Sequence, residues 1–504
     1  QADSFAVTQE ARGATLHLKR AQRSGLLTVT ATVDNGGIPT IASATIDVRE
    51  PTKEAWTTRA ADPDEKPADH QFYARDDRGE GTLHCNGQLD RPGAKLTLTV
   101  TVDGKPYAQS TPTLVGDRYT SAVSLKSGLV RYRAVLTSEL DGQKAILHTA
   151  DDLVCGDAFI IIGQSNAVST DWGNGEGTYQ SEWLRSFGSM SGSPQGLRLW
   201  GPAVHRNHQG GALTIGYWGM ELGQRIIEQQ KVPVCFINGA VGGTRIDQHQ
   251  RNTVNPTDMT TIYGRLLWRV REAKLTHGIR GIFWHQGEND QGADGPTGGY
   301  GYELYREFFH RMAGNWKSDY PNVQVYHLFQ IWPKSCSMGV NGSDNYLREV
   351  QRRLPEDFAR MTIQSTLGID PPGGCHFPPA GYAEMARQLH PVVAREHYGF
   401  QPDGPVTAAN LRTLKSNAAQ NTLTLTFDQP IEWDDALCGQ FSVDGITGVV
   451  TSGKVAGNVL TLSLKTPGGR TLTYLDSKNW SQKTLLRGTN GLAALTFCAV
   501  PITP

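Results

Sequence analysis

The sequence has few cysteines, and their spacing forms no pattern. Seven cysteines occur among 504 residues, with no CxxC pair, so no thiolate metal site is indicated. The histidines also lack ligand spacing, so we predict no catalytic metal and no other cofactor. Two pairs, Cys336 with Cys375 and Cys438 with Cys498, would bridge in an oxidising compartment, with buried free thiols as the alternative.

The sequence also lacks a dominant charge and long apolar runs. Lys and Arg number 48 against 49 Asp and Glu, a formal net charge of −1 without basic runs, which argues against nucleic-acid or polyanion binding. No apolar run approaches the roughly 20 residues needed to cross a membrane. Because no signal segment follows Gln1, we expect a chain that is cytoplasmic or already processed. A composition rich in Gly, Thr and Asn favours a secreted or periplasmic protein. The oligomeric state is not indicated.

What the chain does contain is three regions of different pattern, in line with a length that exceeds one ordinary domain. Residues 1–152 are short alternating segments separated by turn residues such as DPDEKP and DRPG, which predicts a β-sandwich or jelly roll with a loop over 61–70. Residues 402–504 return to the same alternation, in TLTLTFDQPI and VLTLSLKT for example. We therefore expect a second, smaller β-sandwich at the C-terminal end.

Residues 153–401 alternate strands with helices. The strand-like runs are FIIIG, VPVCFING, GIRGIFWHQG, VQVYHLFQIW and RMTIQST. Helical spacing relates Trp218, Leu222 and Ile226, then Tyr263, Leu266, Leu267 and Val270, then Tyr382, Met385, Ala386, Leu389 and Val393. This alternation predicts an α/β fold with a doubly wound parallel sheet covered on both faces, and a site at the carboxyl ends of its strands.

Polar residues follow four of these strands. They are Gln164, Ser165 and Asn166 in the first loop; Gly242, Gly243, Thr244 and Arg245 in the second; His285, Gln286, Glu288 and Asn289 in the third; and Asp370 and His376 in the last. Because the carboxyl ends of parallel strands meet at one edge, we expect these loops to converge.

Together these loops supply what acyl transfer from an ester requires. Ser165 is a nucleophile once a base, His376, takes its proton. A carboxylate would orient the imidazole. The oxyanion of the tetrahedral intermediate would accept hydrogen bonds from the backbone N–H groups of Ser165 and Gly242 and from the side-chain amide of Gln286.

The motifs GQSNA, AVGGTRI, WHQGEND and CHFPPAGYAEMARQL resemble the successive blocks of the SGNH hydrolases. More closely, they are similar to carbohydrate esterases of the sialate O-acetylesterase type, over roughly residues 154–398. The resemblance implies a metal-independent esterase that removes acetyl groups from a sugar or polysaccharide. It implies Ser165 as nucleophile, His376 as general base, and Ser165, Gly242 and Gln286 as the oxyanion hole.

The sequence departs from this family at the acid. The superfamily commonly has Asp three residues before the histidine, where this chain has Gly373. Asp370, six residues before His376, is the nearest carboxylate and the candidate for the triad. The alternatives are a backbone carbonyl that holds the imidazole, giving a Ser–His dyad, or Glu288 acting from the neighbouring loop.

The other polar and aromatic residues near the site have two interpretations each. Asn166, Arg245 and Glu288 either bind substrate or brace the loops, with bracing favoured. Trp172, together with Trp284 and Trp332, either stacks on sugar rings or belongs to the core.

The sequence therefore predicts a serine carbohydrate O-acetylesterase whose partner is an acetylated carbohydrate. The neutral charge favours a plant-type polysaccharide such as xylan or xyloglucan, and a sialate O-acetylesterase is the alternative. Two other functions remain open: a non-catalytic carbohydrate-binding protein on an esterase fold, and a lipase or thioesterase. The polar loops, rich in Gly, Asn, Gln and Trp, favour sugars over long acyl chains.

Overall fold

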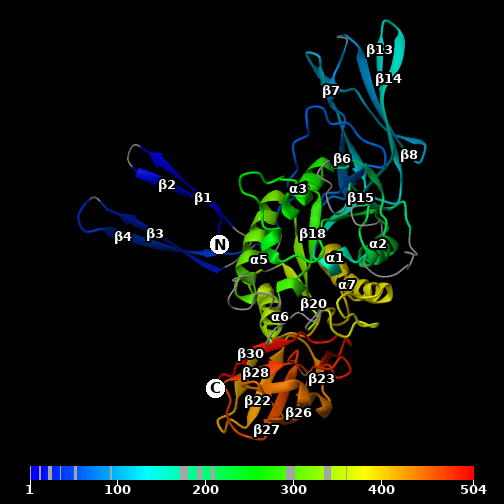
Figure 1. Ribbon diagram of the computed structural model, residues 1–504. Coiled ribbons are helices and arrows are strands. Elements are labelled where there is room, and N and C mark those ends of the chain that lie inside the picture. Colours follow the sequence, from blue (N-terminus) through cyan, green and yellow to red (C-terminus); the bar gives the residue numbers. More distant parts are fainter. Residues whose placement is uncertain are drawn as a thin grey trace.

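The computed structural model has an α/β centre with β-rich regions on two sides (Figure 1). It describes residues 2–504 except 11–12, 21–24, 35, 50, 52–53, 91–92, 171–179, 190–195, 206–210, 291–300, 334–341, 359 and 479. Among the helices of these residues, none combines the length and apolar character needed to cross a bilayer.

The central sheet is doubly wound, as predicted. Its strands are β14 (Gln143–Gly163), β15 (Leu184–Phe187), β16 (Trp200–Pro202), β17 (Val234–Asn238), β18 (Ile279–His285), β19 (Val325–Gln330) and β20 (Met361–Ser365). Their order across the sheet is β16-β15-β17-β14-β18-β19-β20, all parallel except for β16. Since β14 pairs with β17 on one side and β18 on the other, the chain order reverses at β14. Ligands of doubly wound folds bind at such a switch point.

Helices cover both faces of this sheet. They are α2 (Tyr217–Gln230), α3 (Ile262–Glu272), α5 (Tyr302–Asp319), α6 (Ser343–Arg353) and α7 (Pro379–Tyr398), with a short α1 (Ser165–Val168) after β14. Alternate residues of β14 serve the two faces: Phe159 and Ile161 pack with α2 and α7, whereas Ile160 and Ile162 pack with α3 and α5. Both faces of the strand are therefore packed against helices and shielded from solvent, which explains why FIIIG is continuously apolar.

The N-terminal region is joined to the centre by one unbroken strand. The first half of β14 pairs antiparallel with β13, and its second half enters the central sheet, so the predicted boundary between Asp152 and Leu153 lies inside a strand. The other strands here are β5 (Phe72–Ala74), β6 (Glu80–His84), β7 (Gly87–Gln88), β8 (Lys95–Val102), β9 (Lys105–Ser110), β10 (Thr113–Val115), β11 (Arg118–Thr120), β12 (Ala122–Lys126) and β13 (Tyr132–Leu140). They surround their own apolar cluster. The predicted loop over 61–70 contains no strand or helix.

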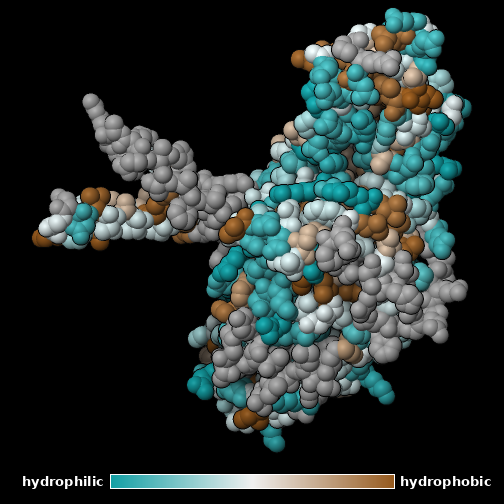
Figure 2. Space-filling view, turned by 45° about the horizontal axis from the view of Figure 1, so that its top comes forward, coloured by the Kyte–Doolittle hydropathy of each residue, from teal (hydrophilic) through white to brown (hydrophobic). Residues whose placement is uncertain are grey.

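The first four strands depart from the expected single sandwich. They are β1 (Ala2–Glu10), β2 (Gly13–Arg20), β3 (Gly25–Val33) and β4 (Thr40–Val48), and they pair only as two hairpins that project from the body (Figure 1). Figure 2 shows apolar surface on the second hairpin. Leu26, Val33 and Ile41 of this hairpin are exposed. The alternation predicts strands correctly here, but pairing beyond the hairpin depends on contacts that alternation does not specify.

The C-terminal region forms two four-stranded sheets, β21-β22-β27-β26 and β25-β24-β28-β30, and the pair β23-β29. Its strands are β21 (Leu411–Ser416), β22 (Thr422–Phe427), β23 (Ile431–Glu432), β24 (Phe441–Val443), β25 (Ile446–Thr447), β26 (Val450–Ala456), β27 (Val459–Leu464), β28 (Thr471–Tyr474), β29 (Arg487–Gly488) and β30 (Phe497–Pro501). The strands were expected, whereas the sandwich arrangement of the flanks stays a prediction. The apolar side chains of this region belong to the same cluster as α2 and α7.

Candidate active site

Ser165 lies directly after the switch-point strand β14, as the first residue of α1. Gly163 makes this turn possible: its φ is 141°, and a Cβ there would lie 2.0 Å from the carbonyl oxygen of His285. Only glycine tolerates that conformation and that contact. The amide of Gln164 donates to the same His285 carbonyl at 3.0 Å, which fixes the turn to the end of β18. Ser165 is 8% exposed, and its hydroxyl has no hydrogen bond within the described residues.

Gly242 lies beside Ser165. A Cβ built on Gly242 would be 3.8 Å from the Cβ of Ser165, so the two backbones are neighbours. The preceding amide, Val241 N–H, donates to the carbonyl of Gly163 at 3.1 Å and so fixes the loop after β17 to the end of β14. Ser165 and Gly242, whose backbone N–H groups are predicted to form an oxyanion hole, are therefore neighbours in the structure.

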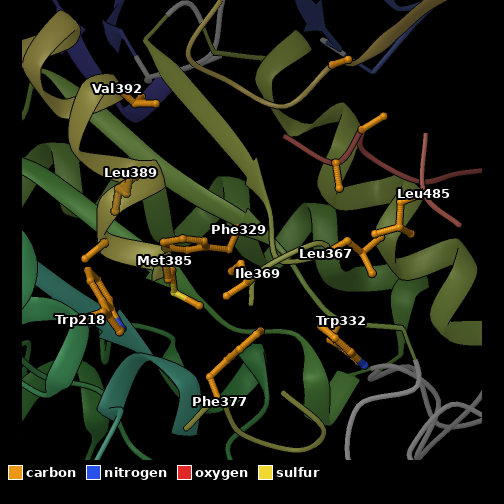
Figure 3. Packing of buried hydrophobic residues seen from close by; sticks show 14 of the residues in the cluster. Trp218, Phe329, Trp332, Leu367, Ile369, Phe377, Met385, Leu389, Val392 and Leu485 are labelled. Atoms are coloured by element: carbon orange, nitrogen blue, oxygen red, sulfur yellow. The ribbon is translucent and has the colours of Figure 1, made fainter. Parts of the chain in front are cut away.

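The loop that carries His376 is held next to Ser165. Asn166 Nδ2 donates to the carbonyl oxygen of Cys375 at 3.2 Å, so the residue after the serine contacts the residue before the histidine. On the other side, Phe377 is buried and packs edge-on against Trp332, with ring centroids 5.7 Å apart (Figure 3). His376 itself is partly exposed. His376 thus lies between two anchored neighbours, and its side chain is partly accessible to solvent.

Asn166 braces these loops. Its Nδ2 also donates to Glu288 Oε1 at 2.7 Å, its Oδ1 accepts from the Tyr382 hydroxyl at 2.9 Å, and its backbone carbonyl accepts from Trp218 Nε1 at 3.0 Å. With its side chain buried and its polar atoms paired, Asn166 ties four elements together and is not placed to bind substrate.

Glu288, in the short turn Glu288–Asp290, is buried beneath the same loops. Its Oε1 lies 3.4 Å from His285 Nε2 and accepts from Asn166. Burial opposes ionisation, but the contacts with His285 and Asn166 outweigh it, so the pKa of Glu288 lies below its ordinary value. The described contacts of Glu288 are therefore those of a loop brace.

Gln286 is buried, and the structure does not support its prediction as an oxyanion donor. Its Nε2 donates to Thr244 O at 3.0 Å, to the carboxylate of Asp290, and to Gln164 Oε1 at 3.2 Å. Two N–H hydrogens facing three acceptors leave none for an oxyanion. Gln286 instead joins the loops after β14, β17 and β18.

Asp290 completes this buried network, although the sequence pattern does not single it out. It accepts from Gln286 and from the amide of Ile246. Burial raises the pKa of its carboxyl to about 8, against these hydrogen bonds. The only signal in the sequence is its place at the end of HQGEND.

Asp370 is exposed, and its carboxylate has no hydrogen bond or ion pair within the described residues. The structure therefore does not pair it with His376. Arg245 forms an ion pair with Asp247, at 3.0 Å between Nε and Oδ1, and so braces its own loop. Trp172 lies outside the described residues. Trp284 and Trp332 are buried, as core aromatics are.

Cys375, next to the site, differs from the cysteines of the C-terminal region. Cys375 is disulfide-bonded, whereas Cys438 and Cys498 are free thiols, which excludes the second predicted pair. Cys336 lies outside the described residues. Within the described part of the chain, no group of three or more His, Cys, Asp or Glu side chains is suited to hold a metal ion.

Comparison with known proteins gives one family match. Residues 155–331 match the model of a family described as carbohydrate esterase, sialic acid-specific acetylesterase. No curated protein matches the chain significantly. The match confirms the resemblance stated from the sequence, and with it the class of carbohydrate O-acetylesterase, a carboxylic ester hydrolase.

Solved structures with the same fold include one that covers most of the chain. A carbohydrate acetylesterase from Xanthomonas citri is 17% identical and superimposes with a TM-score of 0.62, covering 86% of this chain and 98% of that one. A protein from Arabidopsis thaliana is 17% identical, with coverages of 47% and 98% and a TM-score of 0.37. An acetyl xylan esterase from Geobacillus stearothermophilus is 17% identical, with coverages of 48% and 94% and a TM-score of 0.27.

Proposed function

We propose that this protein is a serine esterase that removes O-acetyl groups from a carbohydrate through an acetyl-enzyme. The observation that carries the proposal is the meeting of Ser165, at the end of the switch-point strand, with Gly242 and with the loop of His376. A nucleophile, a base and backbone donors at one strand end are the parts that ester hydrolysis needs.

In the proposed mechanism, the Ser165 hydroxyl attacks the acetyl carbonyl while His376 takes its proton. The backbone N–H groups of Ser165 and Gly242 stabilise the oxyanion. When the tetrahedral intermediate collapses, His376 returns the proton to the departing sugar hydroxyl. Water, activated by the same imidazole, then attacks the acetyl-enzyme and releases acetate.

We further propose that Ser165 and His376 work as a dyad. The exposure of Asp370 and the absence of a described partner for its carboxylate support this view over a triad. Glu288 contacts His285 and Asn166, which favours a bracing role.

For the substrate, we propose a plant-type polysaccharide such as acetylated xylan or xyloglucan. Arg245 is the candidate for a sialate carboxylate, and its guanidinium is already paired with Asp247. The near-zero net charge fits a neutral glycan. A sialate O-acetylesterase is the second candidate, because the matched family model carries that specificity in its description.

The flanking β-regions, proposed to be sandwich-like, would select the glycan or stabilise the centre. An exported location, secreted or periplasmic, is proposed because Cys375 is disulfide-bonded and such bonds persist in oxidising compartments.

The test measures acetate release from acetylated xylan, acetylated xyloglucan and O-acetylated sialic acid. We expect release from one of the two polysaccharides, and a loss of about 10⁴-fold or more in kcat with Ser165→Ala. Asp370→Asn should keep kcat within about threefold of the wild type, whereas a loss of about 10²-fold or more would establish a triad. Release from sialic acid alone would replace the substrate class. Tight glycan binding without any release would leave a binding protein on an esterase fold.

A further inference from the structure

A cleft of about 490 Å³, which Ser165 does not line, separates helix α6 from the C-terminal sheet β25-β24-β28-β30. Figure 1 shows α6 next to β30 and β28. Small-ligand sites have volumes of about 300–1,000 Å³, so the cleft can hold a sugar unit. We propose that it binds a neutral oligosaccharide segment of the polymer whose acetyl groups are removed at Ser165. This inference rests on the proposed esterase function and gives the C-terminal region a part in holding the glycan.

The outer face of the C-terminal sheet forms one wall of the cleft. Successive residues of a strand point to opposite faces of a sheet. Ser442 of β24 and Thr473 of β28 lie directly opposite each other in an antiparallel pair, and the residues that flank them in both strands belong to the apolar core. Ser442 and Thr473 therefore face away from that core, and both line the cleft.

Ser442 carries an unsatisfied hydroxyl on this wall. The residue is 3% exposed, and its Oγ has no hydrogen-bond partner in the part of the chain that the structure describes. Thr473 differs, since its Oγ1 accepts from the backbone N–H of Ala499 at 2.9 Å. Burying a hydroxyl without a partner costs free energy, so such groups are uncommon in folded proteins. A ligand hydroxyl that enters the cleft would supply the missing partner of Ser442.

An aromatic ring forms the wall on the side of α6. Tyr346 lines the cleft and is 43% exposed. Tyr302, at the start of α5, stacks on one face of this ring, with centroids 5.0 Å apart and planes at 22°. The other face is therefore the one available to a ligand. A pyranose ring has an apolar C–H face and hydroxyls around its edge, so it can stack on a tyrosine while its hydroxyls reach a polar wall.

The charged side chains around the cleft balance each other. Arg470 and Lys478 are exposed cations, and their N–H groups can donate to sugar hydroxyls. The carboxylates are held by hydrogen bonds: Asp444 accepts from the backbone N–H of Arg470 at 3.1 Å, and Asp476 accepts from Asn345 Nδ2 at 3.0 Å. With two charges of each sign, the cleft suits a neutral ligand better than a polyanion.

The cleft lies at the same edge of the central sheet as Ser165. Helix α6 follows β19, so its first turn, which carries Asn345 and Tyr346, begins at the carboxyl end of the parallel strands, where Ser165 follows β14. One polymer chain can therefore be held at two points. Once one point is bound, binding at the other is intramolecular, which raises the affinity for a polymer and leaves that for a small ester unchanged.

A chain of aromatic contacts joins the rim of the cleft to the loop of His376. Two residues after Lys478, which lines the cleft, the ring of Trp480 packs edge-on against Trp332, with centroids 5.3 Å apart. Trp332 packs in turn against Phe377, the residue after His376 (Figure 3). The C-terminal region thus contacts the proposed catalytic loop on the side where the cleft lies.

The test separates glycan binding from ester chemistry. In calorimetric titrations with xylohexaose and with an unacetylated xyloglucan heptasaccharide, we expect the wild type to bind one of them, and Tyr346→Ala to weaken that binding by about fivefold or more. The KM for the corresponding acetylated polysaccharide should rise by about three- to tenfold, with kcat and the hydrolysis of 4-nitrophenyl acetate unchanged. Phe400→Ala, which removes a 39% exposed ring beyond the end of α7, is the matched control and should alter none of these values.

Two further variants distinguish a binding role from a structural one. Tyr346→Phe keeps the aromatic ring and should bind the oligosaccharide within about twofold of the wild type. Ser442→Ala removes a buried hydroxyl that has no described partner, so its thermal unfolding midpoint should be equal to that of the wild type or higher. Its affinity for the oligosaccharide should nevertheless fall by about threefold, because the ligand loses a hydrogen bond.

The proposal is overturned if the wild type binds neither oligosaccharide, or if Tyr346→Ala binds as tightly as the wild type. Failure of the esterase function gives a different result. A wild type that hydrolyses no ester, but binds an oligosaccharide more tightly than Tyr346→Ala does, would support the cleft and reject the esterase. An active wild type whose KM for the polysaccharide is unaffected by Tyr346→Ala would support the esterase and reject the cleft.

Discussion

At the scale of single residues, two glycines of the site have opposite reasons for being glycine. Gly163 is required by the fold, because of its positive φ and the His285 carbonyl 2.0 Å from where a Cβ would lie. At Gly242, the nearest atom to an added methyl group is the Cβ of Ser165 at 3.8 Å, an ordinary contact. The free protein therefore has room for alanine at 242, and we propose that the need for glycine there comes from the substrate.

We accordingly expect Gly242→Ala to fold with an unchanged unfolding midpoint and to lose about 10²-fold in kcat/KM, because the methyl group displaces the acyl group from the backbone donor. Gly163→Ala is the matched comparison and should lose stability, with a backbone cost of about 1–3 kcal/mol before the clash is counted. Thermal unfolding and ester hydrolysis, measured on both variants, separate the two effects. An active Gly242→Ala would show that the acyl group lies elsewhere.

At the scale of elements, the sequence predicts well where one periodicity dominates. The strands of the central sheet and helices α2, α3 and α7 follow from apolar runs and 3.6-residue spacing. Helix α5 was not predicted, although Tyr305, Phe309, Met312 and Trp316 lie on one buried face and carry the signal. Helix α6 is less visible because its buried face includes Arg348 and Gln351, which are paired only in the folded protein.

The loops of the site show the limit of such prediction. Ser165, Gly242 and His376 follow from their positions after strands, and the structure brings their loops together. How the side-chain amide of Gln286 in HQGEND is used depends on hydrogen bonds with Gln164 and Thr244, which come from the loops after β14 and β17. The partner of His376 is equally a matter of how a loop folds, which residue spacing does not fix.

The loop network that contains Asp290 gives a prediction about pH. Burial raises the pKa of this carboxyl to about 8, whereas the unfolded chain releases the proton near the ordinary value of 3.8. The folded state therefore retains a proton that the unfolded state has lost. The stabilisation is complete below about pH 4 and is lost as the pH rises toward 8.

Asp290→Asn mimics the protonated carboxyl and should remove this dependence. We expect the free energy of unfolding of the variant, relative to wild type, to increase between pH 4 and pH 8 by a few kcal/mol. Urea denaturation of both proteins at several pH values measures it. A difference that stays constant with pH would contradict the raised pKa.

At the scale of the whole molecule, the regions are less separate than their sequence patterns indicate. Strand β14 belongs to both the N-terminal region and the central sheet. The C-terminal region shares one apolar cluster with α2 and α7. At the end of β19, Gln330 Nε2 donates to the carbonyl oxygen of Thr496 at 2.9 Å, and Gln330 Oε1 accepts from the backbone N–H of Thr496 at 2.8 Å. The catalytic centre and the C-terminal sheets should therefore unfold together.

Arg348 of α6 tests this coupling. It is buried, forms an ion pair with Asp344 at 2.6 Å, and donates to Thr496 Oγ1 at 3.0 Å and to the carbonyl of Leu475 at 3.2 Å. Arg348→Ala leaves a buried carboxylate without its guanidinium, so we expect about 3–5 kcal/mol of destabilisation. Esterase activity and far-ultraviolet circular dichroism should be lost in one transition with urea, at a lower midpoint than in the wild type. Arg412→Ala removes an exposed ion pair with Asp428 and should change stability by less than about 1 kcal/mol. Two separate transitions in Arg348→Ala, with activity surviving the first, would mean that the C-terminal sheets are an independent domain and that the shared cluster does not bind the catalytic centre to them.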